Sequence, residues 1–212
     1  TREDVLQILY QLYGAQNNYK KMIEMIERME LLSGASEQLS LTKMQIYEQM
    51  GDKRKAQAEL LRLVQKNPLE LNYRVMLGNW LLQNNKKKEA YNEYQTVLKE
   101  DPNNAAAQLS LLDYYRDTKN EKMVDELTRK LLESKKTEKE TKMALLRQAI
   151  MDNQDDSTKD SLEVIKLFNR VLSYPQEDAD IVLMKAAYLN LKHAPEDSIN
   201  SVYEQALAIE PD

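Results

Sequence analysis

The chain has 212 residues, of which 42% are hydrophobic and 31% are charged, and its net charge is −5 at pH 7. This composition suits an ordered, mostly helical protein, and the absence of a basic stripe argues against nucleic-acid binding. Because cysteine is absent, disulfides, thiolate nucleophiles and cysteine metal sites are excluded, and no apolar run is long enough to predict a membrane-spanning helix.

A pattern closed by proline recurs along the chain. When each repeat is numbered so that its closing proline is position 32, repeats start at residues 3, 37, 71, 105, 139 and 180. The first four intervals are 34 residues long and the last is 41. A period of this size predicts stacked helical hairpins. We therefore predict one domain over 1–212 with an insertion near 152–161 in the fifth turn, and with these repeats: 3–36, 37–70, 71–104, 105–138, 139–179 and 180–212.

Apolar residues recur in register within these repeats and form one stripe on each predicted helix. Position 20 is small at Ala56 and Ala90, where two antiparallel helices are expected to approach closely. Position 24 lies four residues later and is bulky in most repeats, and we expect it to fill the space between adjacent hairpins: Ile26, Leu60, Tyr94, Phe168 and Tyr203. One hairpin cannot bury its stripe alone, so stacked neighbours are expected to share a continuous core.

The third repeat has the clearest signature, with residues at the characteristic spacings Leu77, Gly78, Ala90, Tyr94 and Pro102. This pattern resembles the tetratricopeptide repeat (TPR) family, and about six repeats in this register cover the whole chain. The resemblance implies an all-α fold, a right-handed α-solenoid of antiparallel helical hairpins. Single repeats depart from the pattern: Lys43 occupies an apolar position, Arg74 replaces a large aromatic residue, and Gly34 and Lys136 replace the closing proline.

The resemblance also implies that the first helix of each hairpin lines a concave groove. The candidate groove residues are Gln7, Gln11, Gln45, Gln49, Asn79, Gln83, Asp113, Arg116, Arg147 and Tyr188. Carboxamides predominate in the first half, and a side-chain amide both donates and accepts, so it can pair with the backbone of an extended peptide. The alternatives are that these amides are ordinary solvated residues and that Tyr188 and Trp80 pack between hairpins.

Some members of the family grip the terminal carboxylate of a chaperone tail with a clamp of lysine and arginine. No register of this chain supplies those cations, since the corresponding residues from the first repeat are Gln7, Gln11, Thr42, Asn72 and Met76. We therefore do not expect chaperone tails as partners. A protein or peptide of unknown identity is predicted, without nucleic acid and without a cofactor, and self-association through the ends of the solenoid stays open.

The insertion in the fifth repeat is acidic and is similar to a calcium-binding EF-hand loop. Its candidate ligands are Asp152, Gln154, Asp156, Asp160 and Glu163. The loop departs from that pattern at Gln154, at Ser157, which replaces the turn glycine, and at Lys159, which replaces an apolar anchor. The alternative is a solvated acidic loop of the composition usual in turns.

The material for catalysis is sparse. His193 is the single histidine, cysteine is absent, and no glycine-rich phosphate loop occurs, so we predict a non-enzymatic protein. The sequence favours an interaction scaffold that binds an extended peptide or a partner helix and belongs to a longer, bacterial protein. A calcium-responsive module and a structural spacer are the alternatives. No targeting segment is visible, so the compartment stays open between a bacterial periplasmic or outer-membrane-associated location and the cytoplasm.

Overall fold

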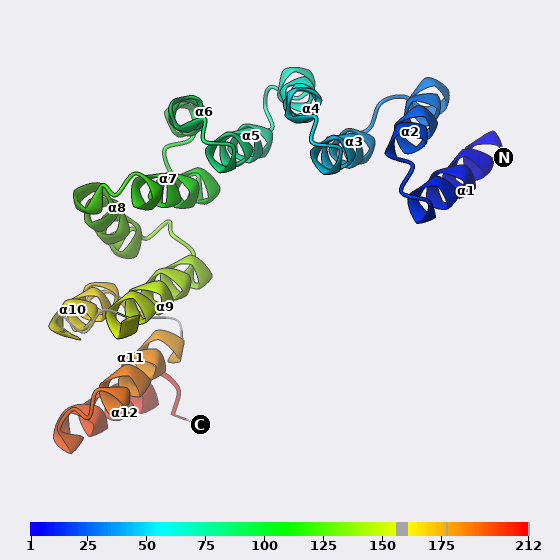
Figure 1. Ribbon diagram of the computed structural model, residues 1–212. Coiled ribbons are helices and arrows are strands. Elements are labelled where there is room, and N and C mark those ends of the chain that lie inside the picture. The colour runs from blue at the N-terminus through cyan, green and yellow to red at the C-terminus, as the bar shows by residue number, and fades with distance from the viewer. Residues whose placement is uncertain (156–160, 177, 212) are drawn as a thin grey trace. The chain divides into compact units, whose positions relative to one another are not determined.

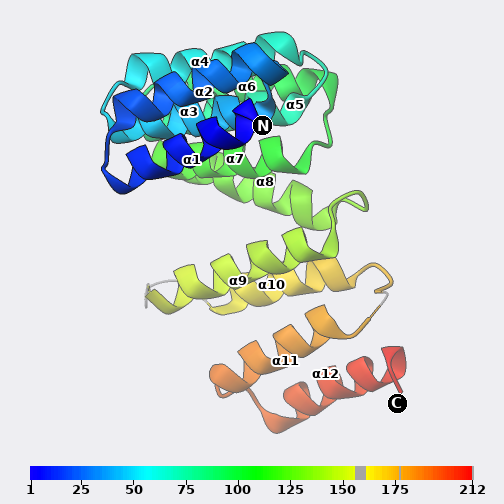
Figure 2. The ribbon, with the colours of Figure 1, turned by 90° about the vertical axis from the view of Figure 1, so that its right-hand side faces the viewer.

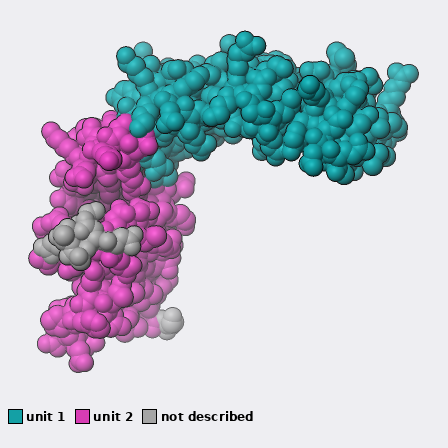
Figure 3. All heavy atoms as spheres, viewed as in Figure 1, with its two compact units in different colours: residues 1–114 teal, residues 115–212 magenta. Residues whose placement is uncertain are grey.

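The computed structural model describes residues 1–155, 161–176 and 178–211, and no β-strand occurs within these ranges (Figure 1). The chain divides into two compact units, Thr1–Tyr114 and Tyr115–Asp212, which Figure 3 shows in different colours. The boundary falls inside α7, Ala105–Asp117.

The first unit contains three complete helical hairpins and the beginning of α7. Their helices are α1 (Arg2–Ala15), α2 (Tyr19–Ser33), α3 (Glu37–Gln49), α4 (Lys53–Lys66), α5 (Leu71–Gln83) and α6 (Lys87–Glu100). Consecutive helices pack on one another from α1 to α6. Figures 1 and 2 show that the first helices α1, α3 and α5 form one layer and the second helices α2, α4 and α6 form the other.

The second unit continues from the end of α7. Its helices are α8 (Glu121–Glu133), α9 (Lys139–Asp155), α10 (Ser161–Leu172), α11 (Asp180–Leu191) and α12 (Glu196–Ile209). Consecutive helices from α8 to α12 pack on one another, and α8 also contacts α10. Helix α9 has 17 residues and reaches Asp155, so the insertion near 152–161 begins as helix.

The sequence period and the helix boundaries coincide. Helices α3, α5, α7, α9 and α11 begin at the residues where the period predicts repeats two to six to start, and α1 begins one residue before the first predicted start. Two helices therefore fall within each predicted repeat in the part of the chain that the structure describes. The prediction of an all-α fold built from helical hairpins is confirmed.

The turns inside the hairpins depend on one residue in the left-handed region. Asn17, Gly51, Asn85 and Lys119 stand at equivalent positions of the first four repeats and have φ values of 53°, 74°, 60° and 56°. Asparagine and glycine tolerate this conformation, which is costly for most other residues. His193 takes the same role in the last turn with φ 53° and is exposed. In three of these hairpins the next residue accepts a backbone N–H and caps the second helix: Asn18, Asp52 and Asn120.

The second helices end in two ways. The C-caps of α4, α6 and α12 are Asn67, Asp101 and Glu210, and each of them directly precedes a proline. Because a residue before proline avoids the helical region, the proline ends the helix. Helix α2 lacks this proline and instead ends at Gly34, whose φ of 86° is a conformation that glycine adopts without steric cost.

Most positions that the period assigns to the core are buried, but the prediction is wrong for Tyr203 on α12, which is 42% exposed. Ala56 and Ala90 are 0% exposed, so the helices of their hairpins approach closely, as the small side chains predict. Tyr94 and Phe168 at the bulky position are also 0% exposed. Close approach explains Gly78 as well, since a Cβ atom there would lie 2.5 Å from Cε1 of Tyr94.

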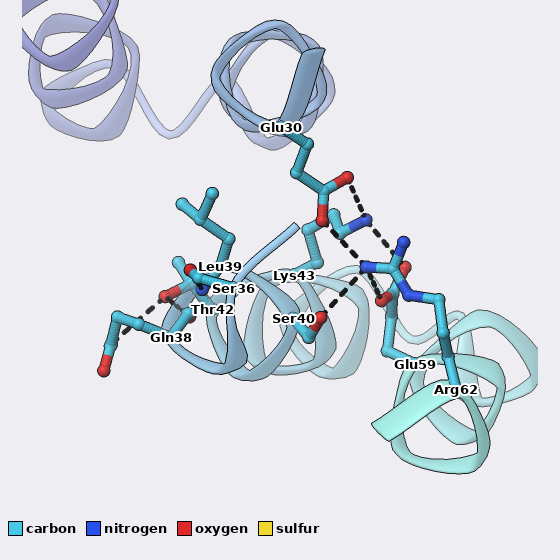
Figure 4. Close-up of polar contacts among 9 residues, drawn as sticks. All are labelled: Glu30, Ser36, Gln38, Leu39, Ser40, Thr42, Lys43, Glu59 and Arg62. Atoms are coloured by element: carbon cyan, nitrogen blue, oxygen red, sulfur yellow. Dashed lines mark hydrogen bonds and ion pairs between the residues drawn. The ribbon is translucent and has the colours of Figure 1, made fainter. Parts of the chain in front are cut away.

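Lys43 occupies an apolar position of the pattern but is only 4% exposed. Its Nζ atom lies 2.8 Å from Oε2 of Glu30 on α2 and 3.0 Å from Oε1 of Glu59 on α4 (Figure 4). Arg62 lies 2.8 Å from Glu30 and 2.7 Å from Glu59, and it donates to Oγ of Ser40 at 3.0 Å. We call Glu30, Lys43, Glu59 and Arg62 the buried charge cluster.

The buried charge cluster holds two carboxylates and two cations, so its formal charge is zero. It joins α2, α3 and α4, and it therefore bridges two successive hairpins. Isolated charges are very costly to bury, and pairing with several hydrogen bonds is what makes their burial tolerable. Lys43 can thus occupy an apolar position of the pattern because Glu30 of α2 and Glu59 of α4 pair with its ammonium.

Candidate peptide-binding surface

The first helices of the first unit expose a set of side-chain amides. Gln7 and Gln11 lie on α1, Gln45 and Gln49 lie on α3, and Gln83 lies on α5; all five are exposed. None of the five makes a side-chain hydrogen bond to another described residue. We call these five residues the amide surface, and each of them can both donate and accept a hydrogen bond.

Asn79 lies on α5 with the amide surface but is half-buried. Its Oδ1 atom accepts a hydrogen bond of 2.8 Å from the hydroxyl of Tyr94. Burial, with a smaller contribution from the charge of Asp113, raises the pKa of Tyr94 well above its ordinary value, so this phenol stays protonated and donates. The Asn79 carbonyl is therefore occupied, and its NH₂ group is the part that is free to donate.

The neighbouring aromatic residue on α5 belongs to the core. Trp80 is 7% exposed, and its Nε1 donates to Oε1 of Glu48 at 2.7 Å. The interpretation of Trp80 as a packing residue is confirmed. Glu48 lies on α3 next to Gln49 in the sequence. The hydrogen bond from Trp80 therefore connects α5 and α3, two helices that carry residues of the amide surface.

The other predicted groove residues do not join the amide surface. Asp113 is exposed in the first unit, Arg116 is half-buried in the second, and both have further interactions within the molecule. Arg147 is exposed on α9 of the second unit. Tyr188 is 2% exposed: its ring lies 6.2 Å from that of Phe168 and its hydroxyl donates to Oδ1 of Asn153 at 2.9 Å. Tyr188 therefore packs in the core and presents no surface to a groove.

The candidate calcium ligands are only partly described. Asp152 and Gln154 lie in α9 and Glu163 lies in α10, whereas Asp156 and Asp160 lie outside the described residues. Asp152 accepts a hydrogen bond of 2.7 Å from Gln148, and Glu163 pairs with Lys166 at 2.6 Å. Among the described residues, no group of three or more acidic or histidine side chains could hold a metal ion. Calcium binding by the complete loop stays a prediction.

Within the described ranges, none of the helices has the length and apolar character needed to cross a bilayer. No protein-family model matches the sequence, and no curated protein is similar to it in sequence.

Solved structures that resemble this chain define its class as a helical-repeat protein. A tetratricopeptide repeat protein from Parabacteroides merdae is 10% identical, with 98% of this chain and 78% of that chain covered and a TM-score of 0.52. Pseudomonas aeruginosa pilF is 11% identical, with 99% and 92% covered and a TM-score of 0.50. The C-terminal part of a TPR repeat-containing protein from Cytophaga hutchinsonii is 15% identical, with 98% and 78% covered and a TM-score of 0.50.

These likenesses, together with helix boundaries that follow the sequence period, identify the fold more closely. The chain has the tetratricopeptide repeat fold, and its helices fit about six repeats along the whole sequence. At these identities the likeness concerns the fold alone.

Proposed function

We propose that the protein is an interaction scaffold that binds an extended peptide segment of a partner through the amide surface. The observation that carries this proposal is that five exposed amides on α1, α3 and α5 have no hydrogen-bonding partner among the described residues. The three helices lie in one layer of the first unit (Figure 1). A run of amides on one layer can follow one extended chain.

The chemistry of the amide surface suits a backbone rather than a charged side chain. An extended peptide alternates N–H and C=O groups along each edge, and an amide can pair with either group. These contacts are independent of the peptide's side chains, so they give affinity with little sequence selectivity. Because the amides are neutral, we expect the affinity to change little with salt concentration.

The test compares two sets of three exposed amides that lie in different layers. One variant combines Gln45→Ala, Gln49→Ala and Gln83→Ala on α3 and α5. The matched control combines Gln65→Ala, Asn92→Ala and Gln95→Ala, because these exposed amides lie on α4 and α6 in the other layer and their side chains have no partner among the described residues. Neither set includes a buried residue, so both variants are expected to fold.

Binding is measured by fluorescence anisotropy with a labelled pool of degenerate nonapeptides whose termini are blocked. Each lost hydrogen bond removes about 1 kcal/mol, so the three substitutions on α3 and α5 should weaken binding roughly a hundredfold. The control should bind as the wild type does. Equal weakening in both variants, or no saturable binding by the wild type, would contradict the proposal and favour a structural spacer.

A further inference from the structure

The second unit contains a cavity of about 650 Å³, and none of the residues that line it belongs to the amide surface. Its walls come from the α8–α9 linker, the first turn of α9, residues 174–176 and 178 after α10, and the beginning of α11. Gln176 fixes one wall, since its Nε2 donates to the carbonyls of Val171 and Tyr174 at 2.9 and 2.6 Å. The volume lies within the range of small-ligand and peptide pockets.

Thr137 brings a hydroxyl to this cavity. The residue is 8% exposed and lines the cavity, and its side chain has no hydrogen-bonding partner in the part of the chain that the structure describes. Its oxygen is not among the described side-chain atoms that are fully buried without a partner, so it is open to the cavity. A ligand atom in the cavity can therefore accept a hydrogen bond from this hydroxyl.

Lys142 brings an unpaired cation to the same cavity. It is half-buried and forms no ion pair with any described carboxylate. Burial lowers the pKa of Lys142. The contrast is Lys139, also in the cavity wall, whose ammonium is held by both Asp178 and Asp180.

The remaining charges at the cavity favour a group with a single negative charge beside Lys142. Glu138 and Glu140 also line it, and both are exposed. They would repel a dianionic phosphate more strongly than a carboxylate, which carries one charge for the ammonium of Lys142. Lys135 is a second cation in the wall. Tyr174 and Pro175 form an apolar part of the wall, although Lys135 already lies 5.8 Å from the centre of the Tyr174 ring.

We propose that this cavity binds a carboxylate side chain of an acidic, extended peptide segment of a partner protein. The carboxylate accepts hydrogen bonds from the Lys142 ammonium and the Thr137 hydroxyl, and the adjoining peptide lies along Tyr174 and Pro175. The site differs from the amide surface in its unit and in its chemistry, because it recognises charge whereas the amides recognise backbone.

The test uses the full chain and isothermal titration with tetraglutamate blocked at both termini. Tetraglutamine of the same design, sodium acetate and inorganic phosphate are the comparison ligands. The variants are Lys142→Met and Thr137→Val, which keep the shape of each side chain. Lys136→Met is the matched control, since Lys136 is exposed in the same linker and does not line the cavity.

We expect tetraglutamate to bind the wild type and the control with equal affinity. This affinity should fall as the salt concentration rises. Because a charge-assisted hydrogen bond is stronger than a neutral one, Lys142→Met should lower the affinity for tetraglutamate about tenfold or more. Thr137→Val should lower it by a smaller factor. The unliganded Lys142→Met variant should melt no lower than the wild type, because a desolvated ammonium has been removed; this readout shows that lost binding does not come from unfolding.

Three results would overturn the proposal: equal affinity of Lys142→Met and wild type, equal binding of tetraglutamine, or tighter binding of acetate or phosphate than of tetraglutamate. The last of these would indicate a site for free anions. The proposed function fails independently, because the Gln45, Gln49 and Gln83 substitutions leave every residue of this cavity in place.

Discussion

At the scale of single residues, the space beside a glycine decides whether a side chain can be added. A Cβ atom on Gly78 would lie 2.5 Å from Cε1 of the fully buried Tyr94, whereas one on Gly14 would lie 3.5 Å from Cε of Met22. The first distance requires the ring to move, and the second is an ordinary contact. Both glycines are in helices, so the two sites differ in space and not in backbone type.

We therefore predict opposite effects of the same substitution at these two sites. Gly78→Ala should lower the free energy of unfolding by about 1–3 kcal/mol through overpacking. Gly14→Ala should raise it by up to about 1 kcal/mol, because alanine is the better helix former. Denaturant unfolding followed by the fluorescence of Trp80, the single tryptophan, reports on this unit. A stabilised Gly78→Ala variant would show that Tyr94 can move without cost.

Glu30 makes the stability of the first unit depend on pH. Burial raises the pKa of Glu30, but hydrogen bonds from Lys43 and Arg62 outweigh this effect, so the pKa lies below its ordinary value of 4.5. A carboxyl group whose pKa is lowered by folding stabilises the protein above its unfolded-state pKa. That contribution is lost as the pH falls through the folded-state pKa.

The prediction compares the wild type with Glu30→Gln by denaturant unfolding at several pH values. The wild type should be more stable by about 2 kcal/mol at pH 7, because the variant leaves Lys43 with one carboxylate fewer. The difference should shrink as the pH falls below 4.5. A difference that stays constant between pH 7 and pH 3 would mean that Glu30 is not ionised in the folded protein.

At the scale of helices, the buried charge cluster specifies how α2, α3 and α4 pack together. Lys43 of α3 contacts Glu30 of α2 and Glu59 of α4, so one side chain connects three elements (Figure 4). Removal of one member of a buried ion pair is strongly destabilising, whereas replacement of both members by apolar residues is often nearly neutral. The ion pairs of the cluster thus stabilise the packing of α2 against α3 and α4, provided that its charges stay balanced.

For this interface we predict that Lys43→Met lowers the free energy of unfolding by about 3–5 kcal/mol. The double variant Lys43→Met with Glu59→Leu should be more stable than the single variant, since it leaves Glu30 paired with Arg62. A double-mutant cycle, with unfolding followed by Trp80 fluorescence, gives the coupling free energy between Lys43 and Glu59. Strictly additive losses would indicate that Lys43 and Glu59 do not interact in the folded protein.

At the scale of the whole molecule, stability is built from contacts between neighbouring helices. The packing pairs in each unit join helices that are close in the sequence, which is the behaviour of repeat proteins. Phe168 is fully buried on α10, where it packs against Tyr188 of α11. A cavity at this position should therefore destabilise mainly the helices of its own unit.

The corresponding prediction concerns Phe168→Ala, whose cost is about 3–5 kcal/mol for a buried aromatic residue. Amide hydrogen exchange should accelerate in α9 to α11, while exchange in α1 to α4 should keep the wild-type rate. Gly78→Ala makes the same test in the first unit, where amide exchange should become faster in α5 and α6. Uniform acceleration along the whole chain would show that both units unfold as one.

Much of the fold could be predicted because a repeat protein encodes it locally. The period placed the starts of α3, α5, α7, α9 and α11, and Ala56 and Ala90 marked where helices approach. The candidate site was less accessible to sequence reasoning. Gln45 and Gln83 are exposed amides, but the same periodicity that placed Tyr188 on a groove gives no measure of its burial.

The sequence by itself determined the helices, their pairing into hairpins and the bulky and small core positions, because these depend on the spacing of apolar residues and on turn-forming residues along the chain. Only the tertiary structure decided the partners of Lys43, the burial of Tyr188 and the meeting of Thr137 and Lys142 at one cavity. Those features depend on which side chains from separate helices meet and how much water they exclude, and a repeat period carries neither quantity.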